Sequence, residues 1–519
     1  MEKKKAVALQ YFAILILIVT SVVLLFATYR RVQSREAVKL QGNTTLLLYE
    51  GPKSLREATK EDLKATGEAL KDFALLRCTD TQILVNGYDT YVYDTNVNHT
   101  RKWVSDYMPP TSRTPITYFD FEGNVEIEVI VPETDIESVR ISPLSYNIEP
   151  VVNKENHSVS FSITKPDAYT IMFNDSPERA VHIFANPLEE DEPSKDDPNV
   201  VYIGPGEWDI ETIVLEDGQT LYLAGGAVVH GIVNANFTKN ITVRGRGIID
   251  GSKFKGWKGK EAYIPLKFDN CENVEIKDII VLNANAWVCQ AFNSKKGVID
   301  GIKIISPRPN GDGITLQSCT DFVVKNGFVR SWDDSLVVKN YAGSSEGIHF
   351  SNMQLWTDLA QSMEIGYETN KGNQTGVYIK DISFRDITVL NNYHKPVISI
   401  HNADDATVSD IQFRDIVVEH AAMGSGDGAE MPYLIDIHIT KNSNWSTTKD
   451  RGEIKDVLID GVTVLSGKSI GSRIQGFDED HMVENVTIKN LTIFGKRIKD
   501  FIDGQIRVDK TTTKKIVLQ

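Results

Sequence analysis

A short strand pattern that recurs through the second half of the chain limits the folds open to it. The pattern is an apolar residue, a spacer, a small polar residue or Gly, an apolar residue, a spacer and an apolar residue. Its copies begin at Ile276, Ile299, Val324, Phe350, Phe384, Phe413, Ile459 and Ile488, at intervals of 23, 25, 26, 34, 29, 46 and 29 residues. Apolar positions with period two are typical of strands. Repeats of this length without helical periodicity predict a right-handed parallel β-helix in which each repeat is one coil.

A second strand pattern follows the first within each coil. It begins at Gly313, Ser335, Ser362, Val397 and Leu434. If coils stack in register, the ends of these strands line up along one face of the solenoid. A groove along that face, open at both ends, suits a polymer. The interval of 46 residues indicates an insertion at 424–451.

The rest of the chain divides by composition. Residues 81–187 contain short alternating segments separated by turn residues, which predicts an antiparallel β-sandwich. Residues 188–199 are acidic and rich in Pro, as expected of a linker to a β-helix domain at 200–519. Residues 54–72 are rich in helix formers, so 36–80 is predicted to be a partly helical stalk.

The N-terminus carries a long apolar run. Residues 6–29 contain no charged side chain, Lys3 to Lys5 precede them, and Arg30 and Arg31 follow. This length is enough to span a bilayer, and no convincing cleavage site follows it. We expect residues 1–35 to form an uncleaved membrane anchor, with the rest of the chain secreted or at the cell surface.

Charge and cysteine content exclude some classes of function. The formal net charge of −15 over 519 residues argues against nucleic acid as a partner, since no basic excess is present to neutralise phosphates. It also argues mildly against a strongly anionic polymer. The four cysteines form no C-x-x-C pair, so a structural zinc site is not expected. They are equally compatible with disulfides and with buried thiols.

Three aspartates carry the chemistry. Asp312 lies in the sequence Asn-Gly-Asp-Gly, and Asp333 and Asp334 begin 21 residues later. This spacing matches one coil, so the three carboxylates are predicted to lie together. Carboxylates at short range repel one another, and one tends to keep a proton while its neighbours stay ionised. An acid beside a base is what hydrolysis of a glycosidic bond requires.

The segments SPRPNGDGI and WDDSLVVKN resemble the pectinase-type β-helix glycoside hydrolases. These are the polygalacturonases of family 28, with further similarity to the dextranases and isopullulanases of family 49, which also have a sandwich before the β-helix. The resemblance covers residues 117–493. It implies an inverting hydrolase without metal or organic cofactor. Asp333 would protonate the leaving oxygen, and Asp312 and Asp334 would activate water.

The chain departs from polygalacturonases in two coils. Gln361 takes the place of a histidine, and Ser399-Ile400-His401 takes the place of Arg-Ile-Lys. The basic pair in that family binds a substrate carboxylate, so its loss favours a neutral α-glucan or another polysaccharide over homogalacturonan. The predicted substrate-binding residues are Asn310, Lys339, Gln361, Glu364, His401 and Trp332.

Aromatic side chains and two other functions stay open at this point. By counting columns, Trp287, Trp332, Trp356 and Tyr393 fall near the groove, where each is a sugar platform or a packing residue. A polysaccharide lyase or epimerase on the same fold would need a basic residue, and often calcium, beside the acids. A carbohydrate-binding adhesin would bind sugar without any need for Asp333.

Overall fold

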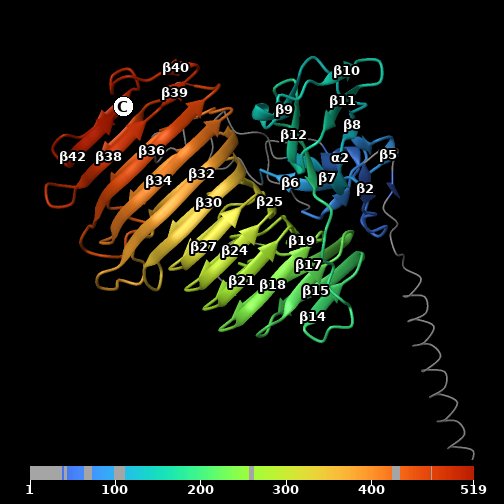
Figure 1. Cartoon of the computed structure of the whole chain (residues 1–519), viewed down its shortest axis with the longest axis horizontal. Helices are drawn as coiled ribbons and strands as arrows, with labels where there is room; N and C mark the ends of the chain where they lie inside the picture. The colour runs from blue at the N-terminus through green and yellow to red at the C-terminus, as the bar shows by residue number, and fades with distance from the viewer. Residues whose placement is uncertain are drawn as a thin grey trace, which may run out of the picture.

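The structure is a computed structural model that describes residues 38–39, 44–63, 73–98, 112–255, 262–423, 433–468 and 470–519. These residues form two small N-terminal sheets and a long solenoid (Figure 1). The predicted anchor at 1–35 lies outside the described residues. Across the described ranges, no helix has the length and apolar character needed to cross a membrane.

The two N-terminal sheets pack face to face. Apolar side chains from both sheets, such as Phe119, Ile127 and Phe161, are buried together between them. Most neighbouring strands are antiparallel, but β13 pairs with β7 in parallel. The eight-stranded sheet contains β1 (Val38–Lys39), β2 (Thr45–Leu48), β3 (Leu76–Arg77), β6 (Tyr93–Val97), β7 (Ser112–Glu122), β9 (Val139–Ser142), β12 (Asp167–Phe173) and β13 (Val181–Asn186). The five-stranded sheet contains β4 (Gln82–Val85), β5 (Tyr88–Asp89), β8 (Val125–Ile130), β10 (Val151–Asn153) and β11 (Ser158–Ile163), and a short 3-10 helix, η1, spans Leu144–Tyr146.

The segment predicted to be a helical stalk differs from that expectation. Its strand β2 pairs with β7, and β3 pairs with β6, so this segment belongs to the eight-stranded sheet. The helix α2 is described over Lys60–Leu63, and residues 64–72 of the expected helix lie outside the described residues. Leu46 and Leu55 are buried, and burial of such apolar side chains outweighs the helix propensity of the surrounding residues.

The solenoid consists of 29 strands, and parallel pairing between coils forms three ladders along it. The first ladder contains β14 (Val200–Ile203), β16 (Thr220–Leu223), β18 (Lys239–Gly245), β21 (Glu272–Lys277), β24 (Lys295–Asp300), β27 (Thr320–Lys325), β38 (Val483–Lys489), β42 (Thr513–Leu518) and the first halves of β30 (Ser345–Thr357), β32 (Tyr378–Asn392), β34 (Thr407–Val418) and β36 (Glu453–Val464). The second ladder contains β15 (Gly206–Val214), β17 (Ala227–Asn236), β19 (Ile248–Asp250), β22 (Ile280–Leu282), β25 (Lys303–Ser306), β28 (Phe328–Ser331), the second halves of β30 to β36 and β39 (Thr492–Ile493), which also pairs with β40 (Lys496–Arg497). The third ladder continues from the end of β17 through β20 (Leu266–Asp269), β23 (Cys289–Phe292), β26 (Ile314–Gln317), β29 (Leu336–Lys339), β31 (Met363–Tyr367), β33 (Ile398–Asn402), β35 (Ile435–Ile439), β37 (Ser472–Gln475) and β41 (Ile506–Val508). The parallel β-helix architecture is thus confirmed; its right-handed winding stays a prediction.

The recurring pattern of the sequence forms one column of the first ladder. The strand pairings join Ile276, Ile299, Val324, Phe350, Phe384, Phe413, Ile459 and Ile488 in this order. All eight side chains are buried in the solenoid core. Phe350, Phe384 and Phe413 stack in parallel, with ring centroids 4.7 and 4.9 Å apart. This distance is the spacing of neighbouring strands, so one side chain type can repeat from coil to coil.

The second strand pattern forms the third ladder. Ile314 pairs with Leu336, Leu336 with Met363, Met363 with Ile398, and Ile398 with Ile435. Because these residues point inward, their neighbours in sequence point outward and line up on one face. The solenoid cysteines Cys271, Cys289 and Cys319 are free thiols buried in its core.

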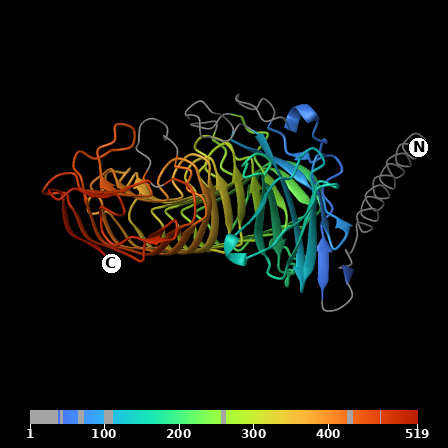
Figure 2. The same ribbon diagram turned by 90° about the horizontal axis from the view of Figure 1, so that it is seen from above.

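The N-terminal sheets pack against the second ladder of the solenoid (Figures 1 and 2). The loops that lead from the second ladder into the third lie next to this contact. Phe184 contacts Phe328 with ring centroids 5.3 Å apart. The buried Arg246 guanidinium lies 2.8 Å from the Asp120 carboxylate, and Lys303 donates to the Asn186 side chain over 2.7 Å. Apolar packing and buried polar contacts together hold the two parts as one body.

Candidate active site

The three predicted catalytic aspartates lie on stacked loops between the second and third ladders. One loop joins β25 to β26 and carries Asp312, and the next joins β28 to β29 and carries Asp333 and Asp334. Ser306 pairs with Ser331 before the loops, and Ile314 pairs with Leu336 after them. Both ends of the two loops are therefore in register. We call these three carboxylates the aspartate cluster.

Backbone amides hold the cluster across three coils. The Asn310 N–H donates to Asp333 Oδ2 over 3.0 Å, and the Asp334 N–H donates to Asp333 Oδ1 over 3.2 Å. The Gln361 N–H, from the following coil, donates to Asp334 Oδ1 over 3.0 Å. Two of the predicted substrate-binding residues, Asn310 and Gln361, thus contact the cluster through their main chains.

Lys339, the last residue of β29, supplies the counter-charge. Its Nζ lies 3.4 Å from Asp312 Oδ2 and 3.4 Å from Glu368 Oε2. Glu368 also accepts a hydrogen bond of 2.8 Å from the Tyr341 hydroxyl. Glu368 is not among the predicted site residues, although it lies just four residues beyond the predicted Glu364. Its role depends on which side chain of the neighbouring coil it meets.

Burial and mutual repulsion change the pKa values of the cluster. Burial, followed by the charges of Asp333 and Glu368, raises the pKa of Asp312 to about 7 against the pull of Lys339. Burial and then the charges of Asp333 and Asp312 hold the pKa of Asp334 well above its usual range. Because the carboxyls interact, their protons belong to the group as a whole. The cluster therefore keeps a proton near neutral pH while part of it is ionised.

A second set of charges lies further along the third ladder, and we call it the ion-pair chain. Its members are Glu364 on β31, His401 on β33, Asp436 on β35 and Arg473 on β37. His401 Nδ1 lies 2.9 Å from Glu364 Oε1, and its Nε2 lies 3.1 Å from Asp436 Oδ2. Arg473 reaches both oxygens of Asp436, with Nε 2.8 Å from Oδ1 and Nη2 2.6 Å from Oδ2.

The pKa values of the chain follow from these contacts. Burial opposes the charged form of His401, but the carboxylates of Glu364 and Asp436 outweigh it and raise the His401 pKa to about 10. Burial likewise opposes ionisation of Asp436, yet hydrogen bonds from its His and Arg neighbours hold its pKa well below the usual range. Burial lowers the pKa of the adjacent His438 to about 4. At neutral pH the chain alternates negative and positive charges.

Among the residues that the structure describes, two groups of side chains have ligand atoms close enough to share a metal ion. The first is His401, Asp436 and His438, but both ring nitrogens of His401 already contact carboxylates. The second is Cys78, Asp80 and Asp94, and there Arg179 forms ion pairs with both aspartates. In each group a protein cation occupies the place of a metal, so we assign neither as a metal centre.

The predicted aromatic platforms separate into two kinds. Trp332 is 1% exposed and packs against Leu359, and Trp356 is buried against the N-terminal sheets. Trp356 and the neighbouring Tyr393 fill space between the coils and the N-terminal sheets, whereas Trp332 is buried within the solenoid loops. Burial favours the packing alternative for these three rings. Trp287 is only half-buried, and it lies near Tyr341 and Lys339 of the site.

Glu364 and His401 lie on the predicted face but are fully buried within it.

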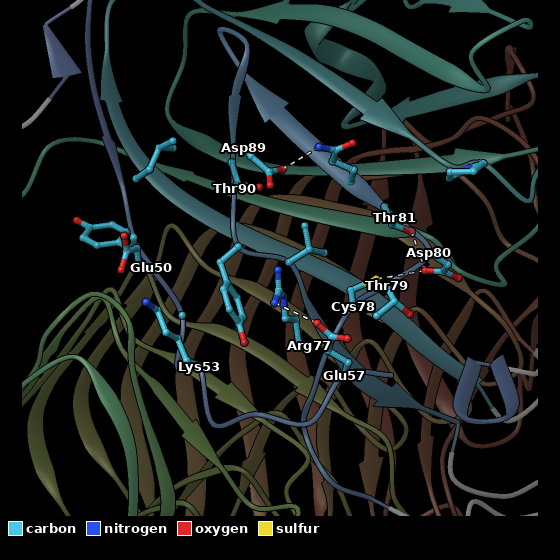
Figure 3. Close-up of a pocket in the computed structure, with 17 residues that line it drawn as sticks. Glu50, Lys53, Glu57, Arg77, Cys78, Thr79, Asp80, Thr81, Asp89 and Thr90 are labelled. Atoms are coloured by element: carbon cyan, nitrogen blue, oxygen red, sulfur yellow. Dashed lines mark hydrogen bonds and ion pairs between the residues drawn. The ribbon is translucent and has the colours of Figure 1, made fainter. Parts of the chain in front are cut away.

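A hollow of about 920 Å³ lies elsewhere, on the N-terminal sheets (Figure 3). Its wall includes the ion pair of Arg77 with Glu57 and the hydrogen bond from Gln82 to Asp89. It contains none of the predicted site residues. The aspartate cluster therefore stays the candidate active site, since its carboxylates are the ones that the stacked loops bring together.

Residues 224–468 match the family model of the glycosyl hydrolases family 28. This range contains the aspartate cluster and its lysine. Over this range the solenoid is similar to the glycosyl hydrolases of family 28.

Family 28 relatives match parts of the chain. A polygalacturonase of Brassica napus is 27% identical over 191 residues, which cover 30% of this chain and 48% of the relative. A probable polygalacturonase of Vitis vinifera is 24% identical over 320 residues, covering 55% and 59%. The chain thus spans about half the length of these curated relatives. Among solved structures, Dex49A from Penicillium minioluteum aligns over 93% of this chain and 100% of its own, with a TM-score of 0.56 and 14% identity. That likeness concerns the fold.

Proposed function

We propose that the protein hydrolyses O-glycosidic bonds of an extracellular polysaccharide with inversion of configuration. The observation that carries this proposal is the aspartate cluster, three carboxylates on stacked loops of a solenoid similar to family 28, in which burial and neighbouring charges raise the pKa values of Asp312 and Asp334. Following the family pattern, Asp333 acts as the general acid, and Asp312 and Asp334 position and deprotonate the water.

The reaction needs a proton donor and a proton acceptor at the same pH. The acid gives its proton to the oxygen of the departing sugar as the bond to the anomeric carbon breaks. Water attacks that carbon from the opposite side, and its proton passes to the basic carboxylate. Both groups then exchange protons with solvent to complete the cycle. Lys339 supports the acceptor, because its charge favours the ionised form of Asp312.

For the substrate we propose a neutral glycan, such as an α-glucan. Three cationic side chains lie along the third ladder, and each is paired with protein carboxylates. They are Lys339, His401 and Arg473. A cation so engaged offers little to a uronate. The half-buried Trp287 and Tyr341 suit contact with the apolar faces of sugar rings. The relatives named polygalacturonases make polygalacturonate the competing substrate.

We also propose that the protein acts outside the cell and is held at the membrane by residues 1–35. The support is the uncharged run at 6–29, flanked by basic residues. A polysaccharide too large to enter a cell has to be cleaved at this location.

The test is release of reducing sugar by the purified full chain in mild detergent. Dextran, pullulan, polygalacturonate and rhamnogalacturonan are compared, with Asp333→Asn as the matched variant. Release that disappears in Asp333→Asn, with the anomer of the first product inverted by NMR, supports the proposal. An unsaturated, ultraviolet-absorbing product would indicate a lyase instead. Sugar binding without release, equal in both proteins, would indicate an adhesin.

A further inference from the structure

We propose that Asp436 is a specificity-determining residue, which holds Arg473 in an internal ion pair and thereby makes the groove selective for uncharged glycans. This inference rests on the proposed function, because it names the feature that sets the substrate class. It concerns the far part of the third ladder, beyond the coils that carry the aspartate cluster.

The contact between Asp436 and Arg473 uses the full geometry of both groups. They are direct neighbours in the pairing of β35 with β37. Two nitrogens of the guanidinium reach the two carboxylate oxygens, at 2.8 and 2.6 Å. A planar guanidinium binds a carboxylate best in this two-pronged manner. Asp436 therefore occupies the donors that would otherwise bind a substrate carboxylate.

The Arg473 side chain is placed where substrate can reach it. It retains 24% of its exposure, whereas the Asp436 side chain retains 3%. Its guanidinium carbon lies 4.8 Å from the centre of the Tyr433 ring. The arginine is thus the accessible end of the ion-pair chain, and the aspartate lies behind it.

The position along the solenoid fits a bound oligosaccharide. Pairing steps lead from Val337 on the catalytic coil to Glu364, then Ser399, then Asp436. Three steps at the strand spacing of about 4.8 Å place Asp436 roughly 14 Å along the third ladder from Val337. A substrate of several sugar units that is cleaved at the aspartate cluster would therefore extend over the ion-pair chain.

The balance of charge explains the selectivity. Glu364 and Asp436 contribute two negative charges, and His401 and Arg473 contribute two positive ones. His438, which lies 3.2 Å from Asp436, is neutral at pH 7 because burial lowers its pKa to about 4. The chain is therefore neutral as a whole. A uronate that binds here would meet an arginine already paired with Asp436, and the Asp436 carboxylate would repel it. An uncharged hydroxyl group would meet no such repulsion.

Asp436→Asn tests the proposal through binding of trigalacturonate by titration calorimetry. All proteins carry Asp333→Asn, so that the ligand is not consumed. Releasing Arg473 should tighten trigalacturonate binding by roughly tenfold or more, since a hydrogen-bonded charge pair is formed. Adding Arg473→Gln to Asp436→Asn should abolish the gain. Asp460→Asn is the matched control and should change nothing, because this carboxylate lies on β36 in the first ladder, 3.5 Å from Arg414 on β34.

An unchanged affinity in folded Asp436→Asn, or a gain that survives Arg473→Gln, would overturn the proposal. If Asp436→Asn does not fold, the salt dependence of trigalacturonate binding by the Asp333→Asn protein tests the proposal instead. Tight trigalacturonate binding that weakens steeply with salt would reveal an available cation and contradict the inference. Weak binding insensitive to salt supports it. Because binding is measured without turnover, failure of the hydrolase proposal is seen separately in the reducing-sugar assay.

Discussion

The aspartate cluster and the ion-pair chain lie along the same ladder of the solenoid, but they balance their charges differently. In the cluster, Lys339 forms an ion pair with Asp312 and also with Glu368, while Asp333 and Asp334 accept hydrogen bonds from backbone amides. In the chain, each carboxylate contacts a cation on the neighbouring coil. The cluster consequently has protons to exchange, whereas the chain has none near neutral pH.

This difference indicates a catalytic role for the aspartate cluster and a structural role for the ion-pair chain. A buried group with an incomplete set of counter-charges is costly to the fold but titrates in the range where catalysis operates. A buried group with complete partners is fixed in charge and position, and removing one partner leaves another stranded. Substitutions in the two regions should therefore have opposite signatures.

The largest effect is expected for Asp312→Asn. Loss of a basic carboxylate should lower kcat about a thousandfold. The melting temperature should hold or rise, because one of three repelling carboxylates is removed. Steady-state kinetics on the best glycan and thermal unfolding measure both, with Asp460→Asn as control. A loss under tenfold, or a marked fall in melting temperature, would contradict the catalytic assignment.

His401→Gln should show the reverse signature. It leaves Glu364 and Asp436 short of a cation in a buried setting, at a cost of about 3–5 kcal/mol in the free energy of unfolding. Denaturant titration measures this cost. His420→Gln is the control, because the His420 ring contacts the Ser466 hydroxyl and should lose only about 1 kcal/mol. Equal losses in the two variants would rule out a special role for the ion-pair chain.

The same histidine predicts how stability depends on pH. Its folded pKa of about 10 lies above the ordinary value of 6.5, so its stabilisation is complete below pH 6.5 and is lost as the pH rises through 10. The stability difference between wild type and His401→Gln should shrink across that window. Melting curves of both proteins between pH 6 and 10.5 test this, and a constant difference would mean that His401 is neutral in the fold.

A smaller effect is expected for Lys339→Gln. Lys339 lowers the pKa of Asp312, so its loss should move the acid limb of kcat/KM to higher pH by about one unit. Lys339→Arg, which keeps the charge, should move the limb much less. The pH profiles of the three proteins provide the comparison. Equal profiles for Gln and Arg would show that charge at this position does not set the limb.

The repeats and the aspartate cluster could be predicted from the sequence because both depend on coil length. A residue one coil later in the chain becomes a spatial neighbour. The spacing of Asp312 and Asp333 in the sequence therefore predicts that they lie close together. The apolar column from Ile276 to Ile488 follows the same rule. Of the predicted helix at 54–72, the described part contains α2 at Lys60–Leu63, and residues before it pack through Leu55 against the N-terminal sheets.

The sequence did not predict which polar side chains pair with one another across coils. Glu368 meets Lys339, and Arg473 meets Asp436, across coils whose loops differ in length. The burial of Trp332 and Trp356 likewise depends on what covers each column from outside.

By itself, the sequence determined a solenoid of stacked coils with three aspartates at one position, because periodic apolar residues and a coil-length spacing are local features of the chain. Only the tertiary structure decided which charges are neutralised and which stay unbalanced. That outcome depends on the outward side chains of neighbouring coils and on the N-terminal sheets packed beside them, and no periodicity in the sequence encodes it.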